Sequence, residues 1–428
     1  MSLFGAFLAL IFLGLPIAFA FGVATMAFTV AMTPLSLKSI LTVGFSSIDS
    51  FSIMAMPFFI FAGDIMRYGG VSNRLVDFAK TLFRKSSSAL GTITVVACAF
   101  FGAISGSAAA TVAAIGGIMI PEMIRNNYGK EYSVALASSA GYLGILIPPS
   151  VPLILFGVTA NKSIGDLFIA GIVPGCLAAV VFVVLNHFLC PKASTPATVS
   201  AAEDRVDIWK SFLGVLPGLM MPVIILGGIY GGIFTATEAA AVAILYGLLV
   251  SVHVYKEIRY RDILRIAYES ALISAKIMFI IAMAGAFGRL MSRLRVPAQI
   301  VDLIMGVSSS HWAILLLINA ILLLLGMVME TGTAIIITTP ILLPIATGIG
   351  MDPIHFGVMM VFNLAIGLIT PPMALNLFVG AQISGVPIPA LVRPIIPFVL
   401  SSLLVLALVV CVPELSIGLA ELLKGFGG

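Results

Sequence analysis

Long apolar segments follow one another along nearly the whole chain of 428 residues. A helix needs about 20 apolar residues to cross a bilayer. Nine segments reach that length: 3–32, 48–66, 132–160, 166–190, 211–232, 236–255, 268–290, 354–384 and 392–412. Charged residues make up only 9% of the chain, against about 25% in soluble domains, which excludes a soluble enzyme. Because lipid cannot satisfy backbone polar groups, the sequence predicts an all-α polytopic membrane protein.

Two further apolar stretches, 91–121 and 311–350, are interrupted by small and hydroxyl residues. The interruptions are Gly102–Ser107 in the first stretch and Glu330–Thr333 in the second. Non-helical backbone at membrane depth is tolerated where other protein covers it. Each stretch is long enough to enter the membrane and return, so we predict two re-entrant hairpins.

The two halves of the chain resemble each other at a shift of 223 residues. The superimposed positions are Pro121 and Pro344, Gly144 and Gly367, Pro148-Pro149 and Pro371-Pro372, Gly157 and Gly380, and Pro174 and Pro397. A repeat in one register indicates two copies of one unit, which we place at 1–190 and 211–428. The stretch 191–210 between them has the composition of a polar linker.

The two copies are predicted to cross the membrane in opposite directions. Between the two Pro-Pro segments we count four full spans and one hairpin that returns to its own side. An even number of crossings inverts the second Pro-Pro helix relative to the first. Inverted repeats with discontinuous helices are typical of secondary transporters, whose sites lie near the membrane midplane.

The paired prolines predict a break within two spans, the helices 132–160 and 354–384. Proline removes an amide donor and pushes the preceding residue out of the helical region. The freed carbonyl oxygens are hard ligands that suit an alkali cation. The hydroxyls of Ser105, Ser107, Thr331 and Thr333 lie at the predicted hairpin tips, where nearby amides can face an anion. Close helix packing explains such small residues equally well.

Other polar residues have local interpretations. Thr235 and Glu238 form a capping box that opens a helix, which outweighs a catalytic role for the glutamate. Lys276 and Glu330 lie deepest in apolar sequence and are functional candidates. Lys276 lies about 10 Å from the end of its predicted helix, so its ammonium can also reach the interface.

Two charged segments, 71–85 and 296–307, carry apolar residues at helical spacing and predict interfacial helices before each hairpin. The four cysteines have no metal-binding or disulfide spacing and are expected to be buried and inert: Cys98, Cys176, Cys190 and Cys411.

Enzyme functions find little support in the chain. It has no H-E-x-x-H, G-x-S-x-G or phosphate-binding Gly-Lys-Ser/Thr motif. An intramembrane hydrolase using Ser105 or Ser107 lacks a suitably placed base. The net charge of +4 gives no case for a nucleic-acid partner. Without a nucleotide loop, transport would be driven by an ion gradient.

The sidedness follows from the basic residues. With the N-terminus inside, fifteen Lys and Arg residues fall on the cytoplasmic side and six fall outside. This bias satisfies the positive-inside rule, so a cytoplasmic N-terminus is predicted.

Several motifs together resemble the large membrane subunit, of DctM type, of tripartite ATP-independent periplasmic (TRAP) transporters. They are Gly14-Leu-Pro-Ile-Ala18, Met56-Pro-Phe-Phe59 with Ala62-Gly63, Gly144 to Ser150, Gly231 to Ala240, Pro340-Ile-Leu-Leu-Pro344 and Thr370-Pro-Pro372. One departure is Ala236, where the family usually has proline, and it leaves the capping box intact.

The resemblance implies an elevator-type importer in the bacterial inner membrane. It would be driven by Na+, which is co-transported and is not a catalytic metal. Its partners would be a separate small four-helix membrane subunit (DctQ type) and a periplasmic substrate-binding protein (DctP type). The substrate would be a small organic acid such as a C4-dicarboxylate or a sialic acid. The alternative is a stand-alone sodium/dicarboxylate carrier of the same superfamily.

The resemblance also implies site residues. The first sodium site corresponds to Ser105, Ser107, Gly144, Ile147 and Pro149. The second corresponds to Thr331, Gly332, Thr333, Gly367, Thr370 and Pro372, where the hairpin tips align only with a short gap. Substrate is expected between the hairpins, in contact with Ser150, Asn363 and Asn376.

Overall fold

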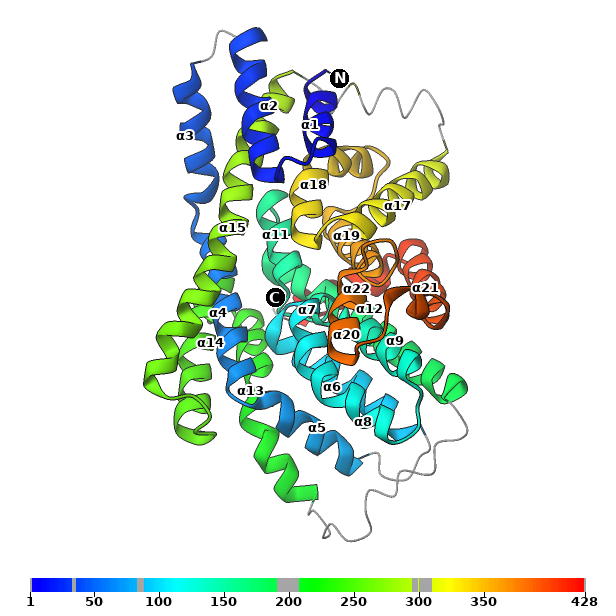
Figure 1. Cartoon of the computed structure of the whole chain (residues 1–428). Coiled ribbons are helices and arrows are strands. Elements are labelled where there is room, and N and C mark those ends of the chain that lie inside the picture. The colour runs from blue at the N-terminus through cyan, green and yellow to red at the C-terminus, as the bar shows by residue number, and fades with distance from the viewer. Residues whose placement is uncertain are drawn as a thin grey trace.

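The computed structural model describes residues 2–32, 36–82, 88–190, 208–294, 299 and 310–426. Every regular element in these ranges is a helix, as the apolar segments predict. Figure 1 shows long helices along one side of the molecule and shorter, broken helices beside them. We call these two parts the lateral layer and the hairpin layer.

The lateral layer is built on the longest helix of the described chain, α15 (Tyr260–Arg293). This helix packs along α2, α3 and α4, and α4 in turn packs on α14. The remaining bounds are α2 Ile17–Met32, α3 Leu37–Ile48, α4 Ala55–Tyr68, α13 Ile208–Tyr230 and α14 Ala236–Leu248. A π-helical turn, Leu249–Val254, extends α14.

The first apolar segment does not form the single span predicted over 3–32. It folds as α1 (Ser2–Phe12) and α2, joined at Gly14, whose φ of 85° favours glycine. The rings of Phe7 and Phe21 stack at 4.3 Å, so the two helices lie side by side. The prediction fails because hydropathy is continuous across a turn that Gly14 and Pro16 make locally.

The hairpin layer contains the first predicted hairpin and the first broken helix. The hairpin arms are α6 (Ala89–Ser105) and a run that joins three pieces: α7 Ala108–Thr111, a π turn Val112–Gly116 and α8 Gly117–Arg125. The broken helix comprises α9 Lys130–Gly141, α10 Leu143–Leu146 and α11 Val151–Thr159, bent by 41° at the Pro-Pro break. It leads into α12 (Ile164–Leu189).

The second repeat copies this order. Its hairpin consists of α17 (His311–Val328) and α18 (Thr331–Gly348). Its broken helix consists of α19 (Pro353–Gly367) and α20 (Leu375–Ser384). The helices α21 (Ile388–Cys411) and α22 (Glu414–Phe426) complete the described chain. In Figure 1 the first hairpin lies below the centre of the molecule and the second lies above it.

Equivalent glycines join hairpin to broken helix in both repeats. A methyl group on Gly102 of α6 would collide with Gly144, and one on Gly367 would collide with Gly326 of α17. Only glycine permits backbones to approach this closely. The same packing therefore occurs twice, as the repeat in the sequence predicts.

Nine helices of the described chain are long and apolar enough to cross a membrane, and the bent pair around Pro148-Pro149 makes a tenth. They include six of the nine predicted spans, those near 48–66, 166–190, 211–232, 236–255, 268–290 and 392–412. The other three of the nine observed helices are hairpin arms: Ala108–Arg125, His311–Val328 and Thr331–Gly348. The chain is thus a multi-pass membrane protein.

Three smaller predictions have different outcomes. The segment 71–85 does form a helix, α5 (Val71–Leu82), with Leu75 buried and Phe78 against Phe212. Most of the segment 296–307 and most of the linker 191–210 lie outside the described residues. The prediction that the cysteines are all buried is wrong, because Cys176 and Cys411 are exposed on the surface of the helices.

Lys276 lies farther from the helix ends than the sequence suggests. It is 16 residues after the start of α15 and 17 before its end, which is about 25 Å from either end at 1.5 Å per residue. Its side chain is exposed. At 34 residues α15 is longer than the hydrocarbon core of a bilayer, about 30 Å, so its ends do not mark the interface and the snorkelling of Lys276 stays a prediction.

Candidate functional site

The first hairpin turns at Gly106, between Ser105 at the end of α6 and Ser107 at the start of α7. Gly106 has a φ of 62°, and a methyl group on it would lie 2.9 Å from the carbonyl oxygen of Pro149. Its own carbonyl accepts a hydrogen bond from the amide of Val151 at 3.3 Å. The hairpin tip is therefore fixed to the Pro-Pro break.

A cluster of hydroxyls and carbonyls lies at this tip. Ser105 Oγ is 3.1 Å from Thr111 Oγ1 and 3.4 Å from the carbonyl oxygen of Ser107. Thr111 donates to that same carbonyl at 2.8 Å. A methyl group on Gly144 would lie 2.9 Å from it. Four of the five residues predicted for the first ion site, Ser105, Ser107, Gly144 and Pro149, thus surround one tip.

Ile147, the fifth residue, lies in the unwound segment, and the contacts found for it are with Leu143 and α12. Its amide donates to the carbonyl of Leu143, and its nitrogen lies beside Gly175 of α12. Thr111 was missed by the sequence analysis. A hydroxyl one helical turn after Ser107 is the signal that points to it.

The second hairpin turns one residue earlier than Thr331. Glu330 is the N-cap of α18, and its Oε2 accepts a hydrogen bond from the amide of Thr333 at 3.1 Å. Gly332 lies against the same carboxylate and against Leu155 of α11. Thr331 is 2% exposed, and its hydroxyl has no partner among the described residues. A buried polar group without a partner is costly in an apolar environment.

The second break is more open than the first. The amide of Met373 donates to the carbonyl of Met327 at 3.2 Å, and Thr370 Oγ1 donates to the carbonyl of Ile366 at 2.7 Å. Pro372 is exposed, whereas Pro149 is buried. Gly367 packs on Gly326 rather than on residues 331–333. The second predicted set is therefore only partly assembled.

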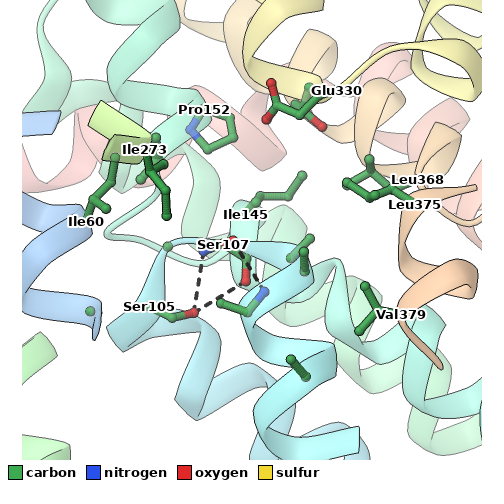
Figure 2. Close-up of a pocket in the computed structure, with 18 of the residues that line it drawn as sticks. Ile60, Ser105, Ser107, Ile145, Pro152, Ile273, Glu330, Leu368, Leu375 and Val379 are labelled. Atoms are coloured by element: carbon green, nitrogen blue, oxygen red, sulfur yellow. Dashed lines mark hydrogen bonds between the residues drawn. The ribbon is translucent and has the colours of Figure 1, made fainter. Parts of the chain in front are cut away.

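A cavity of about 510 Å³ lies where both tips meet the lateral layer. Figure 2 shows Glu330 on one side of it and Ser105 and Ser107 on the opposite side. Ile60 and Ile273 line it from the lateral layer. Its size fits a small-molecule site.

Three polar residues of the cavity lining, two of them charged, were not predicted from the sequence. They are Asp64 and Arg67 of α4 and Gln382 of α20. The sequence gives no signal for them beyond their place near helix ends, where charges are usually interfacial. They reach the cavity because α4 packs directly on the hairpin tip, with Gly63 against Ser105.

None of the three predicted substrate contacts lines this cavity. Ser150 is fully buried and caps α11, its hydroxyl donating to the carbonyl of Ile145 at 2.6 Å. Asn363 donates to Asn319 at 2.7 Å, in a separate groove between α17, α19 and α21. Asn376 donates to the carbonyl of Ser138 at 3.1 Å. In this structure their contacts are structural.

The predicted capping box is confirmed, and it lies away from the cavity. Thr235 accepts from the amide of Glu238 at 3.3 Å, and Glu238 accepts from the amide of Thr235 at 2.8 Å.

The serines at the first tip give no support to the intramembrane hydrolase considered above. The hydrogen-bond partners found for Ser105 and Ser107 are hydroxyl and backbone groups, not a side chain that could act as a base.

Two facing hairpins and two broken helices around one cavity can be compared with known proteins. The family described as "Tripartite ATP-independent periplasmic transporter, DctM component" matches residues 4–415. The chain belongs to this family. The TRAP permeases are transporter subunits and not catalytic enzymes.

Two curated relatives are similar over nearly the whole chain. One is the isethionate TRAP transporter permease protein DctMQ of Oleidesulfovibrio alaskensis, 41% identical over 96% of this chain. The chain spans 65% of the length of that relative. The other is the C4-dicarboxylate TRAP transporter large permease protein DctM of Rhodobacter capsulatus, 36% identical over 98% of both chains.

A solved structure shows the same fold. It is the YdaH transporter of Alcanivorax borkumensis, described as having an unusual topology. The TM-score is 0.64 over 96% of this chain and 97% of that one, with 13% sequence identity. The overall fold of this TRAP permease therefore occurs in another transporter.

Proposed function

We propose that this chain is the large membrane subunit of a sodium-driven TRAP importer for small organic anions. The observation that carries the proposal is the meeting of both hairpin tips at one cavity, each beside a broken helix. Secondary transporters place substrate and coupling ions at such discontinuous helices.

The oxygen cluster at the first tip supports sodium as the coupling ion. Hydroxyls and carbonyls of Ser105, Ser107 and Thr111 lie within hydrogen-bond distance of one another. Such oxygens without a carboxylate suit a monovalent hard cation. At the second tip, Glu330 and the unpartnered hydroxyl of Thr331 supply oxygen atoms beside the cavity. A second sodium ion would bind there.

The relatives and the lining of the cavity support a proposal for the substrate class. The relatives above are named for isethionate and for C4-dicarboxylates, both small organic anions. The cavity combines amides and hydroxyls at the tips with apolar walls from α4 and α15. We propose that the substrate is a small organic sulfonate or carboxylate. A periplasmic binding protein would deliver it to the transporter in the bacterial inner membrane.

A separate small membrane subunit of DctQ type is part of the proposal. The relative named DctMQ joins both names in one longer chain, of which this chain matches 65%. The lateral layer would be the fixed scaffold and the hairpin layer the moving part. The second candidate is a stand-alone sodium-dependent carrier of the same superfamily.

Uptake into proteoliposomes tests the proposal. The chain is reconstituted with its small subunit, and labelled succinate, isethionate and N-acetylneuraminate are supplied with or without a sodium gradient and the cognate binding protein. Uptake that requires both establishes the TRAP importer. Uptake that requires sodium alone establishes the stand-alone carrier, and uptake indifferent to sodium refutes both.

A further inference from the structure

Arg67 places a cation at the cavity from the lateral layer. It lies in the last turn of α4, one turn after Gly63, which touches the carbonyl of Ser105. Its side chain is 30% exposed and lines the cavity. The other charged residues among the described lining are Asp64 and Glu330, both acidic.

The guanidinium of Arg67 is held on two sides. Its Nη2 is 3.0 Å from Asp64 Oδ1, and Asp64 Oδ2 accepts from Ser270 Oγ of α15 at 2.7 Å. The guanidinium lies 4.4 Å from the ring of Tyr68, whose hydroxyl donates to Glu269 at 2.8 Å. Both α4 and α15 therefore fix its position, which reduces the entropy that binding would cost.

One donor of Arg67 is left over. Its Nε is buried and has no hydrogen-bond partner among the described residues. A guanidinium carries five N–H donors in a planar fork, and a carboxylate or sulfonate accepts two of them side by side. Nε itself is shielded from water, but the side chain is 30% exposed and its contact with Asp64 uses Nη2 alone, so a ligand in the cavity would meet the exposed part of the guanidinium.

We propose that Arg67 binds the carboxylate or sulfonate group of the transported anion in this cavity, while Asp64 positions the guanidinium. The inference rests on the proposed function and deepens it by naming the residue that recognises the anionic group. Recognition would come from the lateral layer, opposite the ion-binding tips. It predicts that anion binding, but not sodium binding, depends on Arg67.

Arg74 provides a matched control. It also pairs with a carboxylate, Glu257 at 3.2 Å, and also lies over a tyrosine ring, Tyr255 at 4.0 Å. It does not line the cavity. Arg74→Gln therefore removes the same kinds of contact as Arg67→Gln without touching the proposed site.

The test is thermal unfolding of the full chain in lipid nanodiscs, in sodium chloride or choline chloride. The probes are succinate, isethionate and N-acetylneuraminate, with succinamide as the uncharged analogue of succinate. In the unsubstituted chain and in Arg74→Gln, at least one anion should raise the midpoint in sodium, and succinamide should not. Arg67→Gln should weaken the binding of that anion by about tenfold or more. Arg67→Lys should weaken its binding less.

Sodium alone should stabilise all four chains equally, which shows that Arg67→Gln is folded. Anion affinity that is unchanged in Arg67→Gln overturns the inference and leaves the proposed function intact. If no anion stabilises the unsubstituted chain in sodium, the proposed function fails and the inference fails with it.

Discussion

Ser107 and Glu330 occupy equivalent places in the two hairpins, 223 residues apart. Each is the N-cap of the second hairpin arm, and each side chain accepts a hydrogen bond from the amide three residues later, at 3.4 Å and 3.1 Å. The tips therefore align in the register of the prolines, without the short gap inferred from sequence. A neutral hydroxyl in one repeat is replaced by a carboxylate in the other, which makes the two tips chemically different.

Glu330→Gln should separate the structural and ionic roles of this carboxylate. An amide oxygen still accepts from Thr333, so the unfolding midpoint should stay near that of the parent. Sodium stimulation of uptake should fall, because a charged oxygen is lost beside the cavity. Glu330→Ala should in addition cost about 1 kcal/mol, the usual value of an N-cap.

Asp352 is the control for this pair of variants. It caps α19 by accepting from the amides of Ile354 and His355, at 2.8 Å and 3.0 Å, and it does not line the cavity. Asp352→Ala should lower stability with the sodium response unchanged. Equal sodium responses in Glu330→Gln and the parent would show that the carboxylate is only a cap.

Thr111→Val should weaken the sodium response more than it weakens the fold. Valine keeps the shape but removes the hydroxyl that lies 3.1 Å from Ser105 Oγ and donates to the carbonyl of Ser107. Loss of one ligand should raise the half-saturating sodium concentration about tenfold, or about 1.4 kcal/mol. Uptake measured against sodium concentration gives this value directly.

The matched control is Thr338→Val. Thr338 is also buried and also donates to a carbonyl four residues earlier, that of Ala334 at 2.7 Å, but it lies away from the cavity. Its replacement should leave the sodium response unchanged. A similar loss in both variants would assign the effect to general destabilisation.

Features with a local cause were predictable from the sequence. The breaks at Pro148-Pro149 and Pro371-Pro372, the hairpins and the capping box at Thr235 all follow from residues adjacent in the chain. Gly144 was predictable because a glycine repeats at Gly367. Each of these depends on backbone chemistry that is fixed within a few residues.

Features that depend on packing between distant helices were not predictable. Asp64 and Arg67 reach the cavity only because α4 packs on the first tip, which no spacing along the chain encodes. Asn363 was expected at the substrate site only from the resemblance to the TRAP family. Its side chain instead bonds to Asn319, because the phase of α19 turns it towards α17.

Thr235→Ala should affect folding alone. It removes the side chain that accepts from the amide of Glu238 at 3.3 Å, at a cost of about 1 kcal/mol. The unfolding midpoint should fall while the half-saturating sodium concentration stays constant, because this cap lies in the lateral layer. A change in sodium dependence would contradict the assignment of Thr235 and Glu238 as structural.

Gly144→Ala should impair both the fold and the sodium response, since this glycine belongs to both. Its methyl group would meet Thr111 Oγ1 and the carbonyl of Ser107, the same oxygens proposed to hold the ion. Overpacking of this kind costs about 1–3 kcal/mol. Gly117→Ala is the control in the same hairpin, because nothing lies within 4 Å of the added methyl group. It should be neutral or stabilising, as alanine favours a helix over glycine. If Gly144→Ala keeps full sodium-dependent uptake, the tip and the broken helix do not form one ion site.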